Sequence, residues 1–386
     1  MSKMVTLNDL GYVNRGRSKH RPRNAPELYG GQYPFVQTAD IKHAGLYLNE
    51  YGQTYSQKGL EQSRLWPAGT LCITIAANIA DTAILGCDAC FPDSVIGFIP
   101  DDKKCDVRYV KYLFDTQLQM ALKQLSQGVA QDNLSKDKLL SIKFCVPDLP
   151  VQRRIADVLS AYDDLIENNR RRIAILEETA RLLFQTDIVG GDWPCVPVSE
   201  LIAINPKVAK PRNTIVRYVP MSALSTSGMT VDLHEIEMRS KATSVCFVNG
   251  DVLLARITPC LENGKTAYVN FLGDDEVACG SSEFIVMRGQ KVSPYFTYCT
   301  ARLEAFRSIA IKSMVGASGR QRVQESCFKD FSIQYPGSVA LHRFDQTVKP
   351  MFQQIAFLSK QNAMLVAARD MLLPRLMKGQ PCFSSL

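Results

Sequence analysis

The chain has 386 residues and is 46% hydrophobic, so it is long enough for two ordinary domains that each bury a core. Its twelve cysteines are scattered and accompany no secretory signal or long apolar run, so we expect reduced thiols in a cytoplasmic protein. The net charge of +7 indicates an acidic partner, and a single CxxC pair at Cys87 and Cys90 predicts no metal site.

Residues 1–149 consist of short apolar runs interrupted by Gly, Pro, Asn and Asp, which predicts a head of strands and turns. A long helix is expected at 150–187, because Val151 to Phe184 contains no Gly or Pro. A second head at 188–337, a second long helix at 338–378 and a C-terminal tail at 379–386 follow. Pro350 lies inside the second helical pattern, so it should kink the first turns of that helix or mark its true start.

The two heads resemble one another in sequence. LWPAGTLCIT (from Leu65) resembles CFVNGDVLLA (from Cys246), and SQGVAQDNLSKDKLLSIKFCVP (from Ser126) resembles MVGASGRQRVQESCFKDFSIQYP (from Met314). The repeat of about 190 residues is far longer than a solenoid repeat, so it indicates a duplicated head and helix. The predicted fold class is therefore α+β, with two similar domains that are each followed by a long helix.

Both long helices carry a seam of residues spaced alternately by four and three, which is typical of a coiled coil. In the first helix the seam is Ile155, Leu159, Tyr162, Ile166, Asn169, Ile173, Leu176, Ala180 and Leu183. In the second helix it is Phe344, Val348, Met351, Ile355, Leu358, Asn362, Leu365, Arg369 and Leu372. Each seam needs a partner helix, and we expect each helix to be the partner of the other.

The single Asn in each seam predicts how the helices lie. If Ile155 is a d position, Asn169 is also d, whereas Asn362 is an a position. Antiparallel pairing sets a against d and places both Asn side chains in one layer, and parallel pairing does not. It should also leave one head near each end of a rod, with the two heads related by a pseudo-two-fold axis. Such a buried Asn pair selects the register, because any slip leaves each amide facing hydrocarbon. The alternative is that each Asn merely tolerates partial exposure.

Several polar segments of the heads could contact an acidic polymer such as DNA. The segment RGRSKHRPR contains Arg15, Arg17, Lys19, Arg21 and Arg23, and such a loop could grip phosphates, although a solvated loop is equally open. The second head offers Lys207, Lys210, Arg212 and Arg217 at the corresponding place. Loops at Gln131–Asn133 and Gly319–Arg322 add side chains that can read purine edges, or that could instead cap helices; these are Gln131, Asn133, Arg320, Gln321 and Arg322.

The sequence contains no complete motif for catalysis. Asn263 to Thr266 ends like a phosphate-binding loop, but Pro259 replaces the first glycine that the cradle needs. Asp93, Asp102 and Lys104 imitate a nuclease pattern, yet their surroundings read as a hairpin turn. The sequence contains no GxGxxG, HExxH or GxSxG motif. We therefore expect a chain that is not an enzyme.

The duplicated head–helix plan resembles the specificity subunit of type I restriction–modification systems. The resemblance covers essentially the whole chain and is carried by LPVQRRIADVLSAYDDLIENNRRRI, by ARITPCLENGKTA (from Ala255) and by LLPRLMKG at Leu372 to Gly379. Arg256 and Lys265 of the second motif complete the candidate DNA-contact residues. Pro350 and Arg369 in the second helix depart from the expected apolar seam.

The resemblance implies two target-recognition domains that read a bipartite, asymmetric site in double-stranded DNA. It implies a coiled coil that sets the spacer and docks two copies of a modification subunit, which carries S-adenosylmethionine and methylates adenine at N6. Where a restriction pathway exists, it adds two restriction subunits with ATP and Mg. This chain would hold no cofactor of its own. The alternative function is a coiled-coil scaffold whose two heads bind protein partners.

Overall fold

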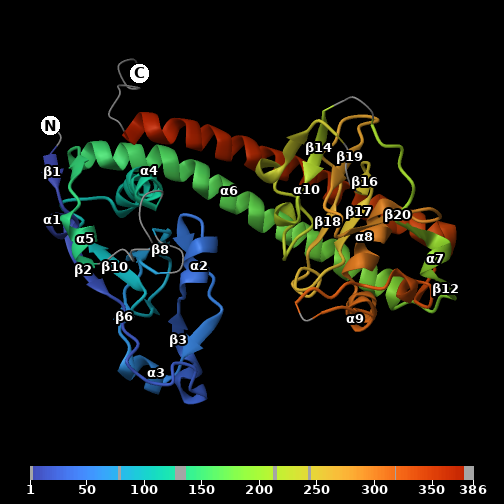
Figure 1. Cartoon of the computed structure of the whole chain (residues 1–386), viewed down its shortest axis with the longest axis horizontal. Coiled ribbons are helices and arrows are strands. Elements are labelled where there is room, and N and C mark those ends of the chain that lie inside the picture. Colours follow the sequence, from blue (N-terminus) through green and yellow to red (C-terminus); the bar gives the residue numbers. More distant parts are fainter. Residues whose placement is uncertain are drawn as a thin grey trace. The chain divides into compact units, whose positions relative to one another are not determined.

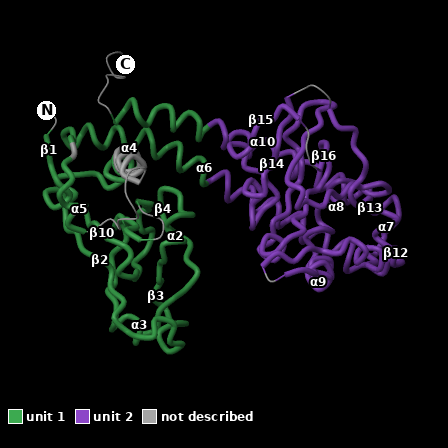
Figure 2. The backbone as a smooth tube through the Cα atoms, viewed as in Figure 1, with its two compact units in different colours: residues 1–167, 365–386 green, residues 168–364 purple. Residues whose placement is uncertain are grey.

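The computed structural model describes residues 3–76, 80–126, 136–211, 215–241, 245–317 and 319–377. The chain forms two compact units, one of Met1–Glu167 with Leu365–Leu386 and one of Asn168–Met364 (Figure 2). Each unit therefore contains one head and one segment of each long helix. Within the described ranges, no helix is both long and apolar enough to span a membrane.

Two β-sheets form the first head, in the orders β2-β10-β7-β8-β4 and β5-β3-β9-β6, and β1 pairs with β11 (Figure 1). The strands are β1 (Lys3–Val5), β2 (Gly11–Arg15), β3 (Tyr29–Phe35), β4 (Tyr47–Leu48), β5 (Gln53–Tyr55), β6 (Leu65–Trp66), β7 (Leu71–Thr74), β8 (Thr82–Leu85), β9 (Ala89–Cys90), β10 (Val95–Pro100) and β11 (Phe144–Val146). The helices are α1 (Leu7–Leu10), η1 (Pro26–Leu28), α2 (Thr38–His43), α3 (Gln57–Gln62), α4 (Val107–Ser126) and α5 (Lys136–Ser141).

The second head has sheets in the orders β13-β20-β17-β18 and β15-β14-β19-β16, and β12 pairs with β21. Its strands are β12 (Cys195–Pro197), β13 (Ile202–Ile204), β14 (Val216–Val219), β15 (Glu237–Arg239), β16 (Val245–Phe247), β17 (Val252–Ala255), β18 (Thr266–Tyr268), β19 (Ala278–Gly280), β20 (Phe284–Gly289) and β21 (Ser332–Gln334). Its helices are α7 (Val198–Leu201), η3 (Met221–Ala223), η4 (Leu233–Glu235), α8 (Pro294–Arg302), α9 (Glu304–Lys312) and η5 (Glu325–Phe328).

The order of strands confirms that the head is duplicated. The sheets β5-β3-β9-β6 and β15-β14-β19-β16 share one pattern, because each has a central parallel pair, β3 with β9 and β14 with β19, between two antiparallel pairs. The turns before the central strands β7 and β17 also match, because Gly69 and Gly250 adopt φ of +81° and +88°. Glycine takes this left-handed conformation without a steric penalty. Their amides bond equivalent carbonyls, those of Leu85 and Val269, at 2.8 and 2.9 Å.

Each head shares its hydrophobic core with a segment of the long helices. In the first unit, Phe98 of β10 and Tyr109 of α4 cluster with Ile155 and Leu159 of the first long helix, α6 (Leu149–Phe184). In the second unit, Phe296 of α8 belongs to the same cluster as residues of both long helices. Because one core includes head and helix, we expect each head to fold together with its helical segment.

The two long helices pair in antiparallel fashion within each unit, as the sequence predicted. In the second unit, the late α6 residue Phe184 contacts the early residue Phe344 of α10 (Gly337–Met377), with ring centroids 5.6 Å apart. In the first unit, the early α6 residue Ile155 clusters with the late α10 residue Leu376. The expectation that Pro350 could mark the start of α10 is wrong, because α10 begins at Gly337 and continues through Pro350. A short π-helical segment, η2 (Gln185–Val189), follows α6.

The seam residues differ in burial along the coiled coil. Those that are buried are Ile155, Leu159, Ile166, Asn169, Ala180, Phe344, Val348, Ile355 and Leu358. Those that are half-buried are Tyr162, Ile173, Leu176, Leu183, Met351, Asn362, Leu365, Arg369 and Leu372. Most of the buried seam residues belong to a core cluster that also contains residues of a head, Ile155 and Leu159 in the first unit and Ala180, Phe344, Val348 and Ile355 in the second.

Candidate nucleic-acid interface

The basic segment Arg15–Arg23 leaves the end of β2 and is held to the first head by its backbone. The amide of Gly16 donates to the carbonyl of Val95 at 2.8 Å, and the amide of Arg17 donates to that of Phe91 at 3.1 Å. The hydroxyl of Ser63 donates to the carbonyl of Arg17 at 2.8 Å. These bonds present the segment as an extended ledge, in which buried Gly16 and Ser18 alternate with exposed cationic residues.

Three of the five cations on this ledge are available to a ligand. Arg15, Arg17 and Lys19 are exposed, and their side chains make no hydrogen bond or ion pair with the rest of the described chain. Arg21 is used internally, because its guanidinium donates to the carbonyls of Ser18 and His20 at 2.9 and 2.8 Å. Arg23 forms a half-exposed ion pair with Asp93 at 3.0 Å. The ledge therefore offers three free positive charges rather than five.

A polar and aromatic cluster beside the ledge was not predicted from the sequence. The guanidinium of Arg64 lies 4.9 Å from the ring centre of Tyr12 and 4.2 Å from that of Trp66, and it donates to the Tyr12 hydroxyl at 2.8 Å. Asn14 donates to the same hydroxyl at 2.9 Å, and Lys136 donates to Asn14 at 3.2 Å. The bonds from Arg64 and then Asn14 lower the pKa of Tyr12.

This cluster has the groups needed to read base edges, namely an amide, a hydroxyl and a stacked guanidinium. Tyr12 is 46% exposed although it lies in a strand. The period-two alternation along β2 places Tyr12 and Asn14 on one face, which is the only signal that sequence reasoning could have used. Arg64 and Lys136 come from distant segments, so only the tertiary structure assembles the cluster.

In the second head, the segment after β13 takes the place of the ledge. Lys207 and Lys210 are exposed and, among the described residues, have no side-chain partner. Lys210 lines a hollow of about 180 Å³ together with Asn205, Arg256 and Ser282. The Nε of Arg256 is buried without a hydrogen-bond partner among the described atoms, while one terminal nitrogen lies 3.4 Å from Glu325. An acceptor that enters the hollow would satisfy this donor.

The predicted loop Gly319–Arg322 lies beside Arg256. Gln321 accepts from the amide of Thr258 and its own amide donates to the Thr258 hydroxyl, both at 3.0 Å. Arg322 pairs with both carboxylate oxygens of Glu283, at 2.7 and 3.0 Å, and these bonds lower the pKa of Glu283. Arg320 is exposed at the tip and its side chain has no partner within the described ranges. Of the three predicted residues, Arg320 is thus the one presented to a ligand.

Some predicted contacts are not part of either surface. The ammonium group of Lys265 donates to the carbonyl of Met221 at 2.7 Å and is half-buried, so it supports the fold. Arg217 pairs with Glu276 at 3.2 Å and donates to the carbonyl of Phe271. Gln131, Asn133 and Arg212 lie outside the described residues.

Two similar heads with exposed cations, each built on a segment of an antiparallel coiled coil, define a class of duplicated DNA-recognition subunits. Comparisons with known proteins agree. Residues 2–178 match the family model described as the type I restriction modification DNA specificity domain. The chain is 24% identical over 406 residues to the type I restriction enzyme MjaIX specificity subunit of Methanocaldococcus jannaschii, covering 97% of this chain and 92% of that one.

Two further proteins are similar to this chain. The EcoEI specificity subunit of Escherichia coli is 29% identical over 174 residues, which is 44% of this chain and 28% of that one. The crystal structure of the type I S subunit from M. genitalium shares the fold, with a TM-score of 0.56 at 14% identity, and covers 97% of this chain and 96% of that one. The predicted resemblance to the specificity subunits of type I restriction–modification systems is therefore confirmed, because residues 2–178 match the domain model and 97% of this chain aligns with a protein of that name. Specificity subunits are non-catalytic components of such systems.

Proposed function

We propose that this chain reads a bipartite DNA site, with one half-site for the recognition domain at residues 1–149 and the other for the domain at 188–337. One observation carries the proposal. Free, exposed cations occupy the same place in both copies of the duplicated head, after β2 as Arg17 and Lys19 and after β13 as Lys207 and Lys210. Duplicated cation sites fit a polymer with regularly spaced phosphates.

Different surfaces of the heads serve affinity and specificity in this proposal. The cations of the ledge in the first head and of the segment after β13 in the second head contact phosphates. These contacts position the duplex but carry no sequence information. Arg320, Arg256 and the Tyr12 cluster are the groups that contact base edges. A target adenine must leave the stack to be methylated, and that step belongs to the modification partner, which binds S-adenosylmethionine. In this proposal, the recognition subunit itself needs no cofactor.

The coiled coil supplies a surface for the partner subunits. Phe357 and Met364 of α10 and Ile175 of α6 are 62%, 65% and 65% exposed. Each lies two positions after an a residue, so all three occupy c positions, which face the same side of an antiparallel pair. A row of large exposed apolar side chains marks a protein-binding surface. We assign this face to two modification subunits, and restriction subunits with ATP and Mg would join that complex.

The experiment is to express the chain with its modification partner and to map N6-methyladenine in the host genome. Methylation at a two-part motif with a fixed spacer is the expected result. Salt titration of DNA binding then distinguishes the scaffold alternative, because phosphate contacts give a steep negative slope of log K against log salt. A flat response together with an unmethylated genome would contradict the DNA-reading function and favour a protein-binding scaffold.

A further inference from the structure

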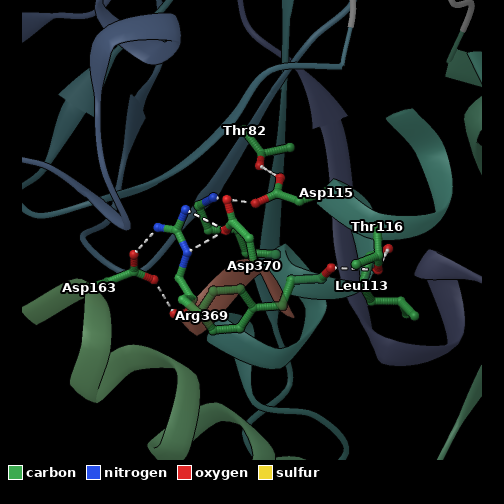
Figure 3. Close-up of polar contacts among 9 residues, drawn as sticks. Thr82, Leu113, Asp115, Thr116, Asp163, Arg369 and Asp370 are labelled. Carbon is green, nitrogen blue, oxygen red and sulfur yellow. Dashed lines mark hydrogen bonds and ion pairs between the residues drawn. The ribbon is translucent and has the colours of Figure 1, made fainter. Parts of the chain in front are cut away.

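A polar cluster lies in the first unit where α4 meets the two long helices. Arg369 occupies a seam position of α10, where a coiled coil normally buries an apolar side chain. Figure 3 shows its guanidinium directed between Asp163 of α6 and Asp370. It forms an ion pair with Asp163, and it donates to Asp370 at 2.8 and 2.9 Å. The Asp163 side chain is only 10% exposed, so this pair is largely removed from water.

The same carboxylate connects the coiled coil to the head. The second oxygen of Asp163 accepts the hydroxyl of Tyr112 from α4 at 2.5 Å. Tyr112 is buried, and burial followed by the nearby Asp163 charge raises the pKa of its hydroxyl. The hydroxyl therefore keeps its proton and remains a donor at any physiological pH. Arg369, Asp163 and Tyr112 form a continuous chain from α10 through α6 to α4, which we call the polar junction.

From α4 the contacts continue to the sheet that carries the ledge. Asp115 of α4 accepts the hydroxyl of Thr82 at 2.5 Å and pairs with Lys111 at 2.6 Å (Figure 3). Thr82 begins β8, which belongs to the same five-stranded sheet as β2. Because β2 leads into the ledge, directional bonds link the seam of the coiled coil to the candidate DNA surface of the first head.

The second unit makes the equivalent junction mainly from aromatic side chains. Phe184 of α6 meets Phe296 of α8 edge to face at 4.9 Å, and Phe352 of α10 packs on Tyr298 at 5.8 Å. Buried Glu177 accepts the Tyr298 hydroxyl and the amide of Met229. The seam residues of α10 in this junction are apolar. Both junctions thus contain a bond from a tyrosine of the head to a carboxylate of α6, and they differ in the seam residue of α10, which is the charged Arg369 in the first junction and apolar in the second.

Apolar side chains of similar volume generally stabilise a junction as well as a buried ion pair does, because both charges must lose water. Directional bonds, by contrast, fix an angle that apolar packing leaves adjustable. Hence we propose that Arg369, Asp163 and Tyr112 are positioning residues that set the orientation of the first recognition sheet on the coiled coil, and thereby the half-site spacing that the subunit accepts. This inference rests on the proposed function.

The test compares stability with spacer preference in the full complex with the modification subunit. The main variant combines Tyr112→Phe, Asp163→Leu and Arg369→Leu, which makes the junction apolar and leaves no buried group unpaired. The control is Arg375→Leu, the same substitution at an exposed site of α10. Each complex methylates a DNA library that contains both half-sites at every spacer length, and thermal unfolding is measured alongside.

We expect the triple variant to melt at or above the temperature of the wild type. The ratio of methylation at spacers one base pair longer or shorter to methylation at the natural spacer should rise about fivefold or more. A stable triple variant with an unchanged spacer profile would overturn the inference. If the triple variant does not fold, an unchanged spacer profile in a folded Tyr112→Phe variant would do the same. A wild-type complex that methylates no bipartite site would overturn the proposed function and this inference with it. An unchanged spacer profile in the variants would leave the proposed function intact.

Discussion

The amide of Asn169 donates to the Oδ1 of Asn362 at 2.9 Å, across the interface between α6 and α10. It also donates to Gln361 at 2.9 Å, so both of its protons are satisfied although Asn169 is 1% exposed. The two Asn residues therefore share one layer, as the a and d positions predicted. The alternative, in which each Asn merely tolerates partial exposure, is wrong for Asn169, whose side chain is buried.

Replacement of both Asn residues tests whether this layer selects the register. Asn169→Leu with Asn362→Leu should leave stability unchanged or raised, whereas either single change should cost about 1–3 kcal/mol, because the remaining amide loses its partner in the coil. Urea unfolding of the two single variants and the double variant measures the coupling. Strictly additive effects would contradict the pairing.

The ledge can be tested through the salt dependence of DNA binding. Arg17→Ala with Lys19→Ala should weaken binding to all sequences and flatten the slope of log K against log salt by about 2 units, since each lost phosphate contact removes about 0.9. Arg21 is left in place because its bonds to Ser18 and His20 support the ledge. The matched control, Lys58→Ala with Lys103→Ala, removes two exposed charges of the same head. Equal slopes for the two double variants would show that the ledge is ordinary surface.

Exchange of a head tests whether the heads read independently. Replacing residues 1–149 by the equivalent head of a relative should change one half of the methylated motif and leave the other half and the spacer intact. The shared core between head and coil means that Ile155 and Leu159 must remain compatible with the new head. Methylome sequencing gives the result directly, and a change in both halves would contradict independent reading.

Charged substitutions test whether the exposed apolar face of the coiled coil binds the modification subunit. Phe357→Glu with Met364→Glu should abolish binding of the modification subunit, because a buried carboxylate without a partner costs several kcal/mol. Binding of DNA by the heads should persist. Lys349→Glu, at an exposed b position of the same helix more than two turns before Phe357, is the control for added negative charge. Co-purification that survives the double change would place the partner elsewhere.

The length of the coiled coil should appear in the spacer of the DNA site. One heptad added to each helix lengthens the coil by about 10 Å, at roughly 1.5 Å per residue. DNA advances about 3.4 Å per base pair, so the preferred spacer should grow by about three base pairs. Whole heptads keep the seam in phase, but the added rotation of the duplex, about a third of a turn, should reduce affinity. An insertion variant that methylates DNA at the original spacer would show that the coil does not set the distance.

Periodic patterns in the sequence predicted the architecture of this protein. Regular spacing predicted the two long helices and their antiparallel pairing, and internal similarity predicted the duplicated head. These features are visible in one dimension because a heptad seam and a repeated segment each depend on residues at fixed separations along the chain. Pro350 was misjudged as a possible helix start, since the packing of Phe344 and Val348 keeps the preceding turns helical.

The candidate site was less accessible to sequence reasoning. Arg21 and Lys265 read as free cations, but nearby carbonyls use both of them. Arg64 had no local signal, because Tyr12, to whose hydroxyl it donates, comes from a distant strand and meets it only in the folded head. Residue type shows which groups could bind a phosphate, and burial and hydrogen bonding decide which of them are free to do so.

The sequence by itself determined the duplicated plan, the helix lengths and the layer that Asn169 and Asn362 share. Only the tertiary structure decided which charges face a ligand and why Arg369 stands in an apolar seam. The reason is that Asp163 and Tyr112, which make that arginine acceptable, come from two other helices. A pattern along one helix records what its seam prefers, whereas a charge becomes tolerable in the seam only through partners that folding brings from elsewhere in the chain.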